Sequence, residues 1–151
     1  MTTESKTEEV KKLTITLTDR PPVKITEGDW PTIAEGSWDK HDGKVECQAN
    51  RRWKVWLKVR QHADGRTIIY GRYSYATAFQ GESDSEYRDG QLITPTPEEY
   101  PESIRDSYWT GPRIVAAIHE VGNRLAERSG HECWPDVIAE TIAELPAEEL
   151  T

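Results

Sequence analysis

Hydrophobic and polar residues alternate most regularly in the middle of the chain. Over residues 53–60 the odd-numbered positions are apolar and the even-numbered positions are mostly cationic. A period of two is typical of a half-buried strand, and residues 67–79, rich in β-branched and aromatic side chains, indicate a second strand. The Asp64-Gly65 pair between them predicts a β-hairpin. The alternating sets are Trp53, Val55, Leu57 and Val59 against Lys54, Trp56, Lys58 and Arg60.

The loop of this hairpin follows from the register that gathers apolar side chains on one face. A two-residue turn would place Leu57 opposite Arg72. A three-residue loop over 63–65, with its last residue, Gly65, as a left-handed bulge residue, places Leu57 opposite Gly71. Because a slip of one residue turns every side chain to the other face, we predict the three-residue loop. The predicted core face is Trp53, Val55, Leu57, Val59, Ile69, Tyr73 and Tyr75.

Shorter strands are expected before the hairpin. Residues 12–18 alternate between apolar and threonine positions, and residues 23–25 follow two prolines, which favours an edge strand. A further strand is predicted over 44–49.

Residues 29–43 allow two interpretations. In the first, Asp29 caps one helical turn that ends at Gly36, and a strand follows over 37–40. In the second, a strand over 32–39 turns at the Asp-Gly pair that follows it. We favour the helical turn.

After the hairpin the pattern changes to an acidic segment, residues 81–111, which is rich in proline and glycine. We interpret it as a long connection that contains a short strand over 91–94. Two amphipathic helices are predicted after it, over 112–128 and 135–145. Their inward-facing residues are Ile114, Ile118, Val121 and Leu125 in the first, and Ile138, Ile142 and Leu145 in the second.

Strands first and helices last predict an α+β fold. We expect one domain over 12–146, in which residues 12–80 form a twisted antiparallel sheet of four to six strands. Both C-terminal helices are expected on one face of that sheet. A disordered tail is predicted over 1–11 and a short tail over 147–151.

Composition limits the setting of the protein. The net charge of −8 argues against general nucleic-acid affinity. No run approaches the ~18 apolar residues of a membrane span, and the polar N-terminus lacks an apolar signal-peptide region. Cys47 and Cys133 are too few for a disulfide framework. We therefore expect a cytoplasmic protein that makes no membrane contact.

One local surface departs from the acidic average. Residues 51–72 contain seven Lys or Arg and one acidic residue, and the predicted register places most of these cations on the outer face of the hairpin. There Trp56 lies opposite Arg72, which predicts a cation–π pair. We call this surface the basic aromatic face. Its candidate binding residues are Lys54, Trp56, Lys58, Arg60, Tyr70 and Arg72, with Arg51 and Arg52 beside them.

The basic aromatic face has three interpretations. It is a solvated strand surface whose lysines prevent edge pairing. Alternatively, it binds single-stranded nucleic acid by stacking and charge. In the third interpretation an acidic partner covers it, either the chain's own segment 82–106 or another protein, including a second copy of this chain.

Motifs for catalysis or metal binding are absent from the sequence. The histidines and cysteines show neither C-x-x-C nor H-x-x-x-H spacing, so no metal or cofactor is expected. A Cys/His enzyme is the remaining catalytic alternative. It would use Cys133, which precedes the predicted second helix, since a helix N-terminus can lower a thiol pKa.

These observations favour a non-enzymatic protein-interaction module, an adaptor or inhibitor, that uses its charge-segregated surface. The first alternative is single-stranded nucleic-acid binding through the basic aromatic face. The second is an acidic inhibitor, which would use carboxylates of 82–106 and of the C-terminus to compete with nucleic acid for a host protein.

Overall fold

A computed structural model describes residues 10–42, 50–99 and 107–147. These residues form six strands, two α-helices and one 3-10 turn, and the predicted α+β class is confirmed. The strands are β1 (Lys12–Ile15), β2 (Val23–Thr26), β3 (Thr32–Asp42), β4 (Arg51–Gln61), β5 (Thr67–Thr77) and β6 (Ser85–Ile93). The helical elements are η1 (Glu27–Asp29), α1 (Pro112–Ser129) and α2 (Trp134–Ala143).

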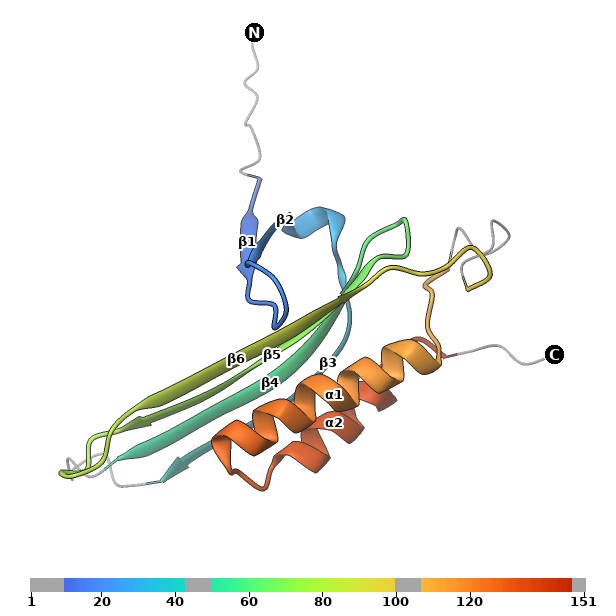
Figure 1. The fold of residues 1–151 in the computed structure, drawn as a ribbon. Coiled ribbons are helices and arrows are strands. Elements are labelled where there is room, and N and C mark those ends of the chain that lie inside the picture. Colours follow the sequence, from blue (N-terminus) through green and yellow to red (C-terminus); the bar gives the residue numbers. More distant parts are fainter. Residues whose placement is uncertain (1–9, 43–49, 100–106, 148–151) are drawn as a thin grey trace, which may run out of the picture.

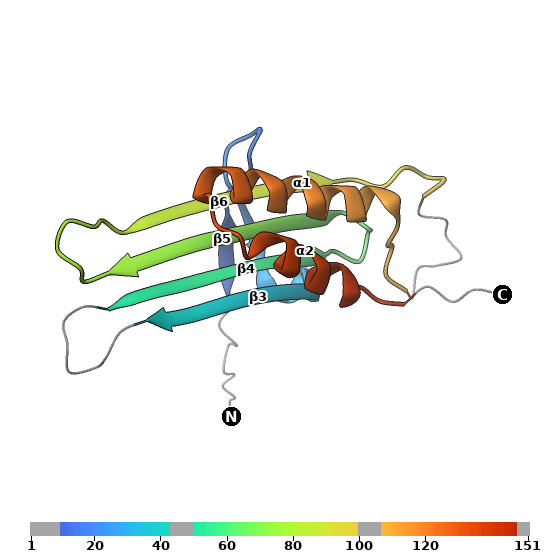
Figure 2. The same cartoon turned by 90° about the horizontal axis from the view of Figure 1, so that it is seen from below.

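The molecule has three layers. The middle layer is an antiparallel sheet in the order β3-β4-β5-β6, and β1 and β2 form a separate antiparallel hairpin. Both helices run along one face of the large sheet, as predicted, whereas the β1–β2 hairpin lies against the opposite face (Figures 1 and 2). We call these two faces the helix side and the hairpin side.

The register of the central β4–β5 hairpin is the one predicted. Leu57 pairs with Gly71 and Val59 pairs with Ile69. The His62 amide donates to the Arg66 carbonyl at 2.9 Å, which closes a three-residue loop. Its last residue, Gly65, has a φ of 91°, a value that favours glycine.

The helix side contains the main core. Val55, Leu57 and Val59 are completely buried against the two helices. Gly36 allows α2 to approach β3 closely, since a Cβ there would lie 2.6 Å from the Val137 carbonyl oxygen. The predicted inward residues of α1 are all buried, and Trp53 and Tyr75 are partly buried at the margin of this core.

The hairpin side contains a second, smaller core. It joins residues of β1, β2 and the following turn to two residues of β5, which are Ile68 and Tyr70. Gly90 of β6 makes the approach possible, because a Cβ there would overlap the Thr16 carbonyl oxygen. The Thr18 amide donates to the Gly90 carbonyl at 2.9 Å and fixes this crossing. The members are Ile15, Leu17, Ile25, Trp30, Ile68 and Tyr70.

Two predictions about secondary structure are wrong. The favoured helical turn from Asp29 to Gly36 is instead a single 3-10 turn, η1, followed by the long strand β3, so the second interpretation was nearer. Residues 81–111 are not only a connection, because β6 occupies Ser85–Ile93 and completes the sheet. Tertiary pairing with β5 decides the second case, and the polar sequence of β6 suits an edge strand.

Some predictions fall on residues outside the described part of the chain. They include the strand over 44–49, most of the N-terminal tail 1–11 and most of the C-terminal tail 147–151.

Candidate binding site on the hairpin side

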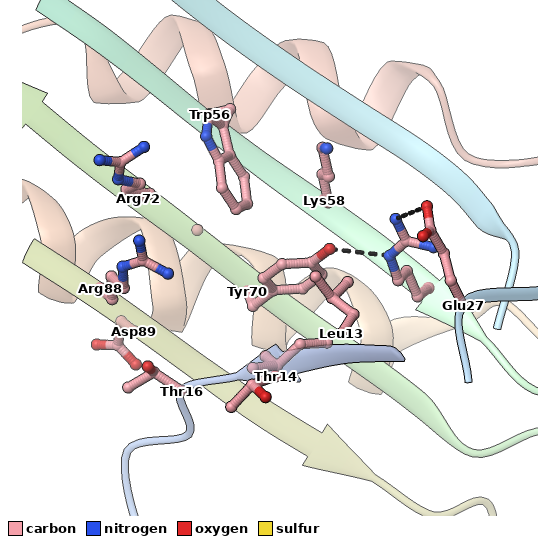
Figure 3. Close-up of a pocket in the computed structure, with 13 residues that line it drawn as sticks. Leu13, Thr14, Thr16, Glu27, Trp56, Lys58, Tyr70, Arg72, Arg88 and Asp89 are labelled. Carbon is pink, nitrogen blue, oxygen red and sulfur yellow. Dashed lines mark hydrogen bonds and ion pairs between the residues drawn. The ribbon is translucent and has the colours of Figure 1, made fainter. Parts of the chain in front are cut away.

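Five of the six predicted binding residues line one cavity on the hairpin side, with a volume of about 230 Å³. They are Trp56, Lys58, Arg60, Tyr70 and Arg72, whose side chains come from β4 and β5 (Figure 3). The sixth, Lys54, lies on the same face of β4 but outside the cavity and is exposed. Strand β1 crosses over the cavity, and residues 13–16, which include the end of β1 and the residue after it, form the other wall.

Strand alternation explains why these side chains gather. Lys58 pairs with Tyr70, and Trp56 pairs with Arg72, so all four point away from the helices. The β1–β2 hairpin covers only part of this face, and the cavity opens beside it. The fold thus turns an alternating polar set into a partly enclosed site.

Arg60 and Tyr70 form the closed end of the site. Arg60 is 7% exposed, and its Nε donates to the Tyr70 hydroxyl at 2.8 Å. Its Nη1 donates to the Trp30 carbonyl at 2.9 Å, and Glu27 lies 3.7 Å from Nη2. Burial raises the pKa of Tyr70, so the phenol stays protonated. These two residues hold the site together and leave little surface for a ligand.

Trp56 and Lys58 form the accessible middle of the site. The indole meets the Tyr70 ring edge-on at a centroid distance of 5.3 Å, and both Trp56 and Lys58 are partly exposed. The Lys58 Nζ lies 5.0 Å from the centre of the Trp56 ring. The cation over Trp56 is therefore Lys58, in place of the predicted Arg72. Lys58 makes no ion pair with any described residue.

Arg72 and Arg88 form the far end of the site, on β5 and β6. Both guanidinium groups donate through Nε to the same oxygen, Oε1 of Glu86, at 2.8 Å and 2.7 Å. The hydrogen bonds from Arg88 and Arg72 lower the pKa of Glu86, which keeps its carboxylate charged. A residue of the acidic segment therefore neutralises part of the basic aromatic face from within the chain.

A buried carboxylate, Asp89, also borders the cavity and is neutralised within the chain. Arg124 of α1 donates to it through Nε at 2.8 Å and through Nη2 at 3.0 Å, and the Thr18 hydroxyl donates to it as well. Asp89 is 3% exposed. The cavity keeps a cationic lining, because both of its carboxylates, Asp89 and Glu27, lie beside arginines.

Sequence reasoning missed the part of the site that comes from β1 and β6. Leu13 and Thr14 belong to β1, and Thr16 follows it; this strand was expected in the same sheet as the β4–β5 hairpin. Arg88 belongs to a segment that was interpreted as a connection. The available signal was the alternation of residues 85–89, where Glu86 and Arg88 share one face.

The alternative catalytic centre finds no support in the geometry around Cys133. The thiol is buried, and burial raises its pKa to about 11, the opposite of what a nucleophilic cysteine needs. Within the described ranges no three His, Cys, Asp or Glu side chains are grouped so that they could hold a metal ion. Cys47 lies outside those ranges.

Comparison with known proteins assigns no family. No protein-family model, curated protein or solved structure matches this chain. Neither helix in the described part of the chain is both long and apolar enough to cross a bilayer.

Proposed function

We propose that this chain is a non-enzymatic protein-binding module whose hairpin-side cavity takes an acidic segment of a partner protein. The observation that carries the proposal is the cavity itself, which collects cations on a chain of net charge −8. Four cationic side chains line it, namely Lys58, Arg60, Arg72 and Arg88. The cytoplasmic location expected from the sequence is kept as part of this proposal.

The burial pattern supports a localised contact and not a long stacking surface. Tyr70 is 7% exposed and belongs to the second core, so Trp56 is the aromatic residue in the cavity that a ligand can reach. Single-stranded nucleic acid is usually bound by several stacked aromatic residues along an open groove. The nucleic-acid alternative therefore has less support than an acidic protein segment.

The acidic-inhibitor alternative also has less support. Glu82 and Glu86 each bind an arginine of the same chain, Arg51 and Arg72 respectively, at 2.8 Å. Asp89 is buried beside Arg124. Carboxylates that are already paired within the chain are poorly placed to imitate nucleic acid.

A titration with a short glutamate-rich peptide tests the proposal, with amide chemical shifts of the labelled protein as the readout. We expect shifts to concentrate at Trp56, Lys58 and Arg72. Arg72→Glu should weaken binding about tenfold or more, because it replaces an attractive charge with a repulsive one. The matched control is Lys54→Glu, which makes the same charge change on the same face outside the cavity.

Equal losses in Arg72→Glu and Lys54→Glu would mean that the peptide responds only to overall charge, and would contradict the proposal. A parallel titration with short single-stranded RNA and DNA tests the nucleic-acid alternative. Saturable binding that weakens steeply with salt and requires Trp56 would favour that alternative.

A further inference from the structure

We propose that the far end of the cavity recognises a phosphate monoester on a phosphorylated side chain of the partner, through Arg72 and Arg88. This inference rests on the proposed function and specifies the ligand of the same site. It begins from the way one carboxylate, Glu86, holds two arginines on neighbouring strands.

One carboxylate oxygen of Glu86 holds both guanidinium groups. Arg72 and Arg88 face each other across β5 and β6, a position in which their like charges repel. The shared oxygen of Glu86 offsets this repulsion and engages only the Nε atoms. The terminal nitrogens of both arginines make no hydrogen bond with a side chain of a described residue, and they remain as donors beside the cavity (Figure 3).

The charge at this end matches a dianion. Arg72 and Arg88 are opposed by the single carboxylate of Glu86, which leaves an excess of one positive charge at this end. Lys58, in the neighbouring middle of the site, adds a second positive charge. A phosphate monoester carries about −1.5 to −2 charges at neutral pH and offers three acceptor oxygens. A carboxylate carries one charge, and one arginine satisfies it in a bidentate pair. The two arginines held by Glu86 therefore fit a phosphate better than a glutamate side chain.

The neighbouring groups suit a phosphate that is attached to a side chain. Trp56 lies between Arg72 and Lys58, and its ring offers an apolar surface (Figure 3). Leu13 adds apolar surface from β1 on the opposite wall. A volume of about 230 Å³ is several times the ~30 Å³ of one water molecule. The site has room for a phosphate together with part of the side chain that bears it.

The test compares three versions of one peptide that differ at a single position: unmodified tyrosine, glutamate and phosphotyrosine. Isothermal titration calorimetry on the full chain measures each affinity. We expect the phosphorylated peptide to bind at least about tenfold more tightly than the glutamate version. Arg72→Gln and Arg88→Gln should each abolish that preference, whereas Lys54→Gln should preserve it. Circular dichroism confirms that each variant is folded.

Glu86→Gln distinguishes the positioning of the two arginines by Glu86 from a simple effect of its charge. The substitution removes a negative charge next to the site, so charge alone predicts tighter phosphate binding. If Glu86 positions the two arginines, the phosphate preference falls in Glu86→Gln although the site is more positive. Tighter binding of the phosphorylated peptide to Glu86→Gln would overturn the positioning role.

The possible failures are distinguishable. Equal affinity for the phosphorylated and glutamate peptides would overturn the phosphate inference and leave the proposed function standing. If none of the peptides binds, both proposals fail. The remaining outcome is that a single-stranded oligonucleotide binds more tightly than the phosphorylated peptide and loses affinity in Arg88→Gln. In that case the phosphate that the site recognises belongs to nucleic acid, and the protein-partner inference is wrong.

Discussion

The two faces of the central sheet are built from the same strands and do different work. On the helix side, Val55, Leu57 and Val59 of β4 are completely buried under two helices. On the hairpin side, Lys58 and Trp56 of the same strand are partly exposed beside a cavity. One alternating sequence therefore supplies both the main core and the candidate binding site.

The difference between the faces lies in what covers them. The two helices run along the strands (Figure 2), and their apolar residues bury the middle of the helix side, where Val55, Leu57 and Val59 lie. The β1–β2 hairpin is short and covers the opposite face only in part (Figure 1). A small covering element can bury Tyr70 and Arg60 and still leave neighbouring cations accessible. Partial coverage is how this fold makes a cavity.

The largest expected effect separates the two faces by stability. Leu57→Ala should lower the free energy of unfolding by about 2–5 kcal/mol, because it removes fully buried methyl groups and leaves a cavity. Trp56→Ala, one residue away on the partly exposed face, should cost less than half as much. Urea denaturation measures both. A larger loss for Trp56→Ala would show that the hairpin side is the main source of stability.

The second largest effect is expected where a substitution disrupts the contact between the β1–β2 hairpin and the large sheet. Gly90→Val should cost about 1–3 kcal/mol, because its Cβ would overlap the Thr16 carbonyl oxygen. Hydrogen exchange should speed up in β1 and β2 and change little in α1. Gly28→Val is the control, since nothing lies within 4 Å of a Cβ there. Uniformly faster exchange in both regions would mean that the hairpin does not detach separately.

A third comparison measures how much the Arg60–Tyr70 hydrogen bond at the closed end of the site contributes to stability. Tyr70→Phe removes a hydroxyl that accepts a buried hydrogen bond from Arg60 and leaves that charged donor unsatisfied, so it should cost about 1–3 kcal/mol. Tyr75→Phe removes a hydroxyl that donates to the exposed Glu82, and should stay within about 0.5 kcal/mol of the wild type. Thermal unfolding compares the two variants. Equal effects would contradict the burial of the Arg60–Tyr70 pair as the cause.

The smallest expected effect depends on pH and concerns Glu82, which lies between β5 and β6. Hydrogen bonds from Arg51, Tyr75 and Thr77 lower the pKa of Glu82 from its usual 4.5 to about 2. A depressed pKa stabilises the folded state above the unfolded pKa, and this contribution is lost as pH falls through the folded pKa. The difference in melting temperature between wild type and Glu82→Gln should therefore be constant above about pH 5 and shrink toward pH 2.

Glu98→Gln is the control for this pH series, because Glu98 makes no side-chain hydrogen bond with a described residue. Its melting temperature should follow that of the wild type across the range. A Glu82→Gln difference that persists unchanged to pH 2 would mean that the contacts of Glu82 do not depend on its charge.

Much of the fold was predictable because its signals are local. The register of β4 with β5 followed from alternation and from a glycine in the loop, and the buried stripe of α1 followed from helical spacing. Strand β6 was missed because Glu86 and Arg88 make its sequence look like a surface connection. Its strand form depends on pairing with β5, a contact that no local window contains.

Alternation along a strand is a property of the backbone, so the amino-acid sequence alone establishes which residues of the central hairpin share a face. It places Trp56, Lys58, Arg60, Tyr70 and Arg72 together on the side away from the main core. Long-range packing settles the rest: Arg60 and Tyr70 are buried, Lys54 lies outside the cavity, and Glu86 brackets Arg72 and Arg88. Those outcomes depend on the β1–β2 hairpin, on the turn that follows it and on β6, which are distant in sequence from the β4 residues of the site and reach it only when the whole chain folds.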